Sequence, residues 1–110
     1  MHNIFVTNLG YIIGIIMVML SIPLLVWDIP RNSWYGVRIP KAYVSNKNWK
    51  IINTYGAKVL IFWGFICIIT VLFLNLFVKD FEYVFYFYQS VSFIFLIIAI
   101  VQILLFARKV

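Results

Sequence analysis

The residues best suited to bind a ligand are gathered between Asn32 and Gly56. Arg38 follows Trp34 and Tyr35 closely in the sequence. A guanidinium can hold a phosphate or a carboxylate through two parallel hydrogen bonds, and it can stack on an aromatic ring. The candidate residues for binding a ligand or a partner are Asn32, Trp34, Tyr35, Gly36, Arg38, Pro40, Trp49, Asn53 and Gly56.

Asp28 leaves two interpretations of Arg38 open. In the first, the Asp28 carboxylate is a charge partner of Arg38, and the pair pins this segment to the end of the preceding apolar run. In the second, Arg38 binds an anionic ligand, Gly36 lets the backbone approach it, and the amides of Asn32 and Asn53 add contacts. The sequence does not decide between them.

Catalysis is the first alternative to binding. One acid beside several bases could position a phosphate-bearing lipid, either for reaction or for binding of its headgroup. Asp28 lacks an activated nucleophile or a histidine base beside it, and Cys67 and His2 each stand alone. We therefore expect no catalytic residue, no metal and no cofactor, and a protein that is not an enzyme.

The composition predicts a membrane protein. The 110 residues are 65% hydrophobic and only 11% charged, and the mean hydropathy is +1.06. A soluble domain with this composition would expose large apolar patches. The apolar runs are continuous and reach the ~20 residues that cross a ~30 Å hydrocarbon core as a helix, whereas three strands cannot close a barrel.

We therefore predict an all-α fold, a bundle of three transmembrane helices in a single membrane domain, residues 1–110. The expected spans are residues 4–27, 48–78 and 84–107. The first run is too long for the core of a signal peptide and has no basic segment before it, so we expect it to remain as an anchor.

The distribution of charge predicts the orientation. Eight of the nine Lys and Arg residues lie between the first two spans, just inside the second, or after the third. Short loops rich in Lys and Arg stay on the cytoplasmic side. We expect the loop of residues 28–50 and the C-terminus to be cytoplasmic and the N-terminus to be outside. Anionic lipid headgroups, not nucleic acid, are the expected partners of these cations.

The candidate residues depend on a bent loop and on one long helix. Pro30 and Pro40 favour extended backbone before them, and Gly36 marks a turn between them. Ser45 is a candidate helix N-cap. A helix over residues 48–78 is about 46 Å long, so its first turns stand at the membrane surface and face the loop. We call residues 28–56 the polar segment.

Small and polar residues mark the helix faces that should pack together. Gly10 and Gly14 belong against the other helices of the chain, or else form the seam of a homo-oligomer; the first interpretation is favoured. The amides of Asn75, Gln89 and Gln102 should bond between helices. Their other interpretation is a transport path in a small transporter or channel subunit, although no charged residue lies deep in any span.

The segment N-S-W-Y-G-V-R-I-P, followed by Ser45, Trp49, Asn53 and Gly56, resembles the signature of the SdpI family. Ile39 departs from it, since the family often has Thr there. The resemblance implies a multi-pass protein of the bacterial cell membrane that gives immunity to a membrane-active peptide toxin. In the founding case it also implies that the cytoplasmic face holds a transcriptional repressor. We expect a small immunity or signalling protein that binds a peptide toxin or a cytoplasmic regulator.

Overall fold

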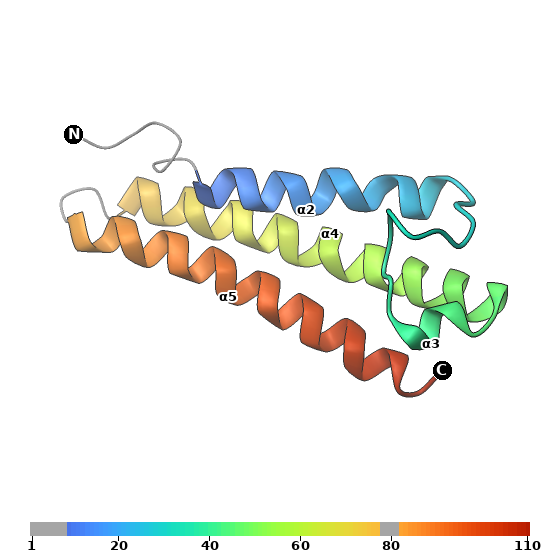
Figure 1. The fold of residues 1–110 in the computed structure, drawn as a ribbon. Helices are drawn as coiled ribbons and strands as arrows, with labels where there is room; N and C mark the ends of the chain where they lie inside the picture. Colours follow the sequence, from blue (N-terminus) through green and yellow to red (C-terminus); the bar gives the residue numbers. More distant parts are fainter. Residues whose placement is uncertain (1–8, 78–81) are drawn as a thin grey trace.

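The structure, a computed structural model, describes residues 9–77 and 82–110, and these form helices and no strand. The long helices α2 (Leu9–Val26), α4 (Asn46–Phe77) and α5 (Glu82–Ala107) run along the length of the molecule. The short helix α3 (Pro40–Tyr43) lies at one end of the bundle (Figure 1). The prediction of an all-helical fold is confirmed for the described residues.

Two helical stretches in the described part of the chain are long and apolar enough to cross a membrane, Asn46–Leu74 and Ser90–Ala107. Gly10–Val26 is a shorter apolar helix. Residues 4–8 of the first predicted span, Val78 of the second, and the loop that follows it lie outside the described residues.

Local signals set the helix starts around α3. Ile39 is extended (φ −112°, ψ 156°), as a residue before proline prefers, and Pro40 opens α3. The Ser45 hydroxyl accepts a hydrogen bond from the backbone N–H of Asn48 over 3.0 Å. Ser45 therefore provides the predicted cap at the start of α4.

Helix α4 is the centre of the bundle, because α2, α3 and α5 all pack against it. Its contact face carries small or buried residues, and its phenylalanines face outward. Gly56, Gly64, Cys67 and Val71 are buried, whereas Phe62, Phe65 and Phe73 are exposed. The predicted packing face is confirmed up to Val71; the side chain of Asn75 lies outside the described residues.

Glycines let α2 and α4 touch through their backbones. A Cβ on Gly14 would lie 2.9 Å from the carbonyl oxygen of Gly64, and a Cβ on Gly64 would lie equally close to that of Gly14. A Cβ on Gly10 would meet the side chain of Val71 at 2.7 Å. The two glycines of α2 therefore pack inside the chain, which is the favoured interpretation, and they are not free to form a seam with another copy.

The side-chain amide of Gln102 on α5 forms hydrogen bonds with two residues of α4. The indole Nε1 of Trp63 donates to Gln102 Oε1 over 2.9 Å, and Gln102 Nε2 donates to the Tyr55 hydroxyl over 3.2 Å. The ring of Tyr55 stacks on that of Phe106, with centroids 3.8 Å apart. Gln102 thus makes the interhelical bonds predicted for it; the side chain of Gln89 is outside the described residues.

The glycine contact between α2 and α4 gives a first prediction. Gly64→Ala should lower the free energy of unfolding by about 1–3 kcal/mol, because the added methyl must push α2 away from α4. Reversible unfolding in detergent micelles measures the change. The neighbouring Phe65→Leu, at an exposed position, serves as control, and equal stability of the two variants would contradict the packing.

Candidate functional site

The loop between α2 and α3 is shaped by Asn32. Its side-chain Oδ1 accepts the backbone N–H groups of Trp34 (3.0 Å) and Tyr35 (2.6 Å), and its Nδ2 donates to the carbonyl of Pro30 over 2.8 Å. Asparagine commonly closes turns in this way. The Asn32 amide, which the sequence offered as a ligand contact, is instead used inside the loop.

Asn53 fastens the loop to α4. Its Oδ1 accepts the backbone N–H of Val37 over 2.5 Å, and its Nδ2 donates to the carbonyl of Trp49 over 2.9 Å. The Asn53 side chain is buried. A backbone N–H away from water needs such a partner, and Asn53 supplies it where the loop enters the bundle.

Glycines at positions 36 and 56 make room for this contact. Gly36 has φ +105°, a conformation that residues with a Cβ rarely adopt. A Cβ there would also lie 2.6 Å from Asn53 Oδ1 and 3.2 Å from the Trp49 ring. A Cβ on Gly56 would lie 2.8 Å from a methyl group of Val37. Both glycines therefore serve the docking of the loop.

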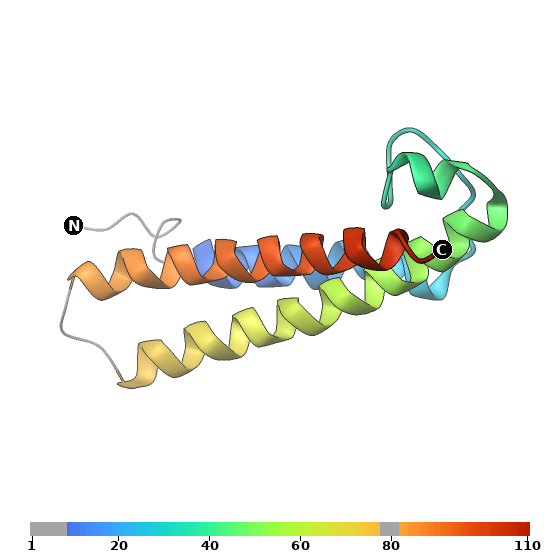
Figure 2. The ribbon, with the colours of Figure 1, turned by 90° about the horizontal axis from the view of Figure 1, so that it is seen from below.

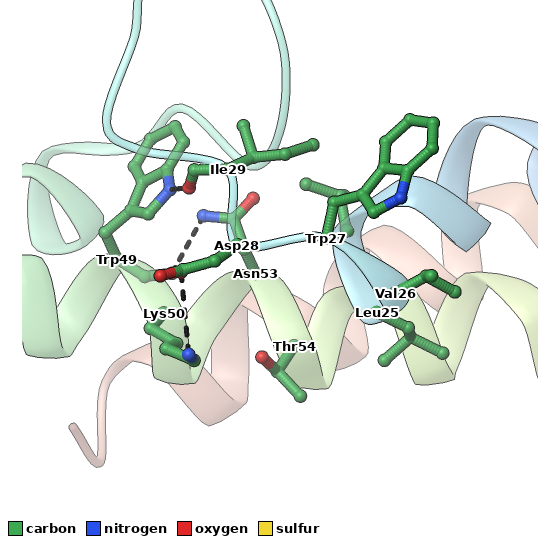
Figure 3. Close-up of a pocket in the computed structure, with 10 residues that line it drawn as sticks. Leu25, Val26, Trp27, Asp28, Ile29, Trp49, Lys50, Asn53 and Thr54 are labelled. Carbon is green, nitrogen blue, oxygen red and sulfur yellow. Dashed lines mark hydrogen bonds and ion pairs between the residues drawn. The ribbon is translucent and has the colours of Figure 1, made fainter.

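Trp49 is the second fastening point. Its ring is buried, and its Nε1 donates to the carbonyl of Ile29 over 2.9 Å (Figure 3). The ring packs in a cluster with Ala42, Ile52 and Ala107, which come from α3, α4 and α5. The structure thus brings the two halves of the polar segment together, with Trp49 as a structural anchor.

The pair of Arg38 with Asp28, one of the two interpretations left open by the sequence, is not formed. Arg38 Nη1 donates to the carbonyl of Ser33 over 2.5 Å. Asp28 Oδ1 lies 3.5 Å from Lys50 Nζ instead (Figure 3). Asp28 lies two residues after the end of α2 and faces the first turns of α4, whereas Arg38 lies beyond the turn at Gly36.

The ion pair of Asp28 and Lys50 lies in a cleft between the end of α2 and the start of α4. One hollow of about 160 Å³ includes both residues and Thr54, and an adjoining hollow of about 560 Å³ adds Arg31 and Lys47. Side chains of Asp28 and Lys50 are 84% and 68% exposed. Exposed pairs contribute little to stability, so both groups are available to a ligand. We call this site the cationic cleft, lined by Asp28, Arg31, Lys47, Trp49 and Lys50.

The four remaining predicted residues lie in the loop or at the start of α3. Arg38 and Trp34 are exposed, and Pro40 begins α3. The Tyr35 hydroxyl donates to the carbonyl of Leu20. Burial raises the pKa of Tyr35 above its ordinary value of 10.0, so the phenol stays protonated at neutral pH and keeps this donor.

Sequence reasoning missed the cationic cleft as a site. It treated Lys47 and Lys50 as contacts for lipid headgroups, used Arg31 only as one of the charges that predict the orientation, and gave Thr54 no role. One signal was present, because Lys47, Lys50 and Thr54 follow one another at spacings of three and four and so share a face of α4. The sequence did not reveal that the loop would bring Asp28 and Arg31 to that face of α4.

Comparison with known proteins gives one match. The model of the family described as SdpI/YfhL protein family matches residues 28–107 of this chain, which begin at Asp28 and take in the polar segment and almost all that follows it. No curated protein matches, and no solved structure matches.

The docking of the loop gives a second prediction. Asn53→Leu should lower the free energy of unfolding by about 1–3 kcal/mol, because it leaves the N–H of Val37 without its acceptor. Unfolding in detergent micelles measures the loss, and protease cleavage within residues 30–38 should become faster. Asn46→Leu, at an exposed position on the same helix, should change neither. Normal resistance of the loop in Asn53→Leu would show that another contact holds it.

Proposed function

The chain belongs to the SdpI/YfhL protein family, and we propose that this immunity-type membrane protein crosses the membrane three times and protects its cell by binding a peptide toxin at the cationic cleft. Family membership and the apolar helices support a membrane protein of this class. The toxin, the site and the orientation are our inference.

The orientation follows from the charges at one end of the bundle. The loop with Arg31 and Arg38, helix α3 with Lys41, and the C-terminal end of α5 with Arg108 lie at the same end (Figures 1 and 2). Lys and Arg in short segments next to a span favour the cytoplasmic side. We therefore infer that this end is cytoplasmic and that the N-terminus is outside.

The observation that carries the proposed function is the cationic cleft itself. Its two hollows share Asp28, Lys50 and the buried ring of Trp49. The smaller hollow adds the apolar side chains of Leu24 and Leu25, and the larger adds the cations Arg31 and Lys47. Carboxylates of a peptide can pair with the cations while its apolar side chains contact the wall. Such a site acts by holding its ligand in a one-to-one complex, without turnover.

A cytoplasmic regulator is the second candidate partner, because the cleft opens at the end that we assign to the cytoplasm. Lysines and arginines there would attract an acidic surface and speed the encounter. A phosphate-bearing lipid as substrate is the enzymatic alternative, and it requires Asp28 as the acid or base.

A third prediction tests the orientation. In a Cys67→Ala background, cysteines introduced at Ser33 and at Lys109 should react with a membrane-impermeant maleimide only after the inner membrane is opened. A cysteine placed at the N-terminus should react in intact cells. Labelling of Ser33→Cys in intact cells would overturn the proposed orientation.

A fourth prediction tests immunity. Expression of the chain should raise the survival of a toxin-sensitive bacterium exposed to a membrane-active peptide toxin. Lys50→Gln should weaken protection about ten-fold, the effect of about 1.4 kcal/mol of lost binding energy. Lys58→Gln is the matched control, since Lys58 is also an exposed lysine of α4 but does not line the cleft.

The same assay separates binding from catalysis. Asp28→Asn keeps the shape of the cleft and should leave most of the protection, whereas an enzyme that depends on this carboxyl would lose all of it. Survival that does not exceed that of cells without the chain would contradict the immunity function.

A further inference from the structure

Another hollow, lined mainly by apolar side chains, lies between α2, α4 and α5. Its volume is about 360 Å³, and residues 34–37 of the loop also line it. Ile13, Ile16 and Leu20 of α2 line one wall, with Leu60 of α4 and Leu96 of α5 opposite. We call it the apolar groove; Leu24 is the one lining residue that it shares with the cationic cleft.

The two hydroxyl groups that border the apolar groove already have partners within the chain. The hydroxyl of Ser21 donates to the carbonyl of Met17 over 2.6 Å, and that of Tyr35 donates to the carbonyl of Leu20. Neither requires a hydrogen bond from an occupant. The groove therefore offers an occupant hydrocarbon contact along its walls and fits an apolar chain.

The length of the groove matches one leaflet of a bilayer. Its lining on α2 runs from Ile13 to Leu24, which is eleven helical steps, or about 16 Å at 1.5 Å each. Half of a ~30 Å hydrocarbon core is about 15 Å. An acyl chain that enters at the loop would thus end near the middle of the membrane.

A cation, Arg38, lies beside the part of the loop that lines the groove. Arg38 donates to the carbonyl of Ser33, the residue before Trp34, and Trp34 borders the groove with its ring 75% exposed. One hydrogen bond leaves most of the donors of a guanidinium available. A long apolar groove with a guanidinium near one of its lining segments is complementary to a molecule with one hydrocarbon chain and one anionic head.

We propose that the apolar groove holds an acyl chain of an anionic phospholipid and that Arg38 binds its phosphate. The inference depends on the membrane location of the protein and not on toxin binding, so a failed survival assay would leave it standing. The lipid would fill the space between α2 and α5, the pair of long helices with the least mutual contact.

The experiment compares two isoleucines that differ in one respect. Ile15 and Ile16 are each 49% exposed, but only Ile16 lines the groove. The purified chain and the variants Ile16→Trp and Ile15→Trp are mixed in detergent with phosphatidylglycerol or with phosphatidylcholine of the same acyl chains. Native mass spectrometry counts the bound lipid.

The wild-type chain and Ile15→Trp should retain one phosphatidylglycerol, whereas Ile16→Trp, whose indole fills the groove, should retain it about ten-fold less. Arg38→Gln should lose the preference for phosphatidylglycerol over phosphatidylcholine, and Lys47→Gln, a cation of the cationic cleft, should keep it.

Equal retention by the two tryptophan variants would overturn the proposal for the acyl chain. An unchanged lipid preference in Arg38→Gln would overturn the assignment of the phosphate. A dimer that is lost in Ile16→Trp and kept in Ile15→Trp would assign the groove to a second copy of the chain, and would overturn the proposal as well.

Discussion

The fold depends on the need to pair one backbone N–H inside an apolar bundle. The loop after α2 turns back and packs the half-buried Val37 against the core cluster that contains Met17, Val59 and Ala99. An N–H group left there without an acceptor would lower the free energy of unfolding by more than an exposed ion pair usually contributes. Asn53 Oδ1 accepts a hydrogen bond from the N–H of Val37, and the turn at Gly36 orients that N–H toward it. This bond docks the bent loop on the first turns of α4, and the cationic cleft lies where the two meet.

Several residues that the sequence suggested as ligand contacts have a structural role in this loop. Asn32, Gly36, Trp49, Asn53 and Gly56 have the types expected of a ligand site, yet each is used to build or dock the loop. The groups left for a partner are charged and exposed, namely Asp28, Arg31, Lys47 and Lys50 in the cleft and Arg38 outside it. Most residues of the signature thus hold the shape of the loop, whereas Arg38 is the one charged residue of the signature and stays exposed.

The limits of prediction from this sequence have a physical cause. Helices, their small-residue faces and the capping role of Ser45 depend on spacing along the chain, and spacing is visible in the sequence. The charge partner of Asp28 depends on the path of a loop that contains two prolines and a glycine with positive φ. Several paths satisfy the same local preferences, and tertiary contacts, among them those with Trp49 and Asn53, select one. The helical scaffold was therefore predictable, and the pairing of Asp28 with Lys50 was not.

The length of α4 has a mechanical consequence. Its 32 residues extend about 48 Å, so a ~30 Å hydrocarbon core can accommodate it only by tilt or by leaving one end outside. Its first turns are tied to the loop at two points, Ile29 and Val37. A thinner or thicker bilayer that changes the tilt of α4 must then carry the loop with it, so that the loop and the start of α4 respond to the thickness of the surrounding lipid as one unit.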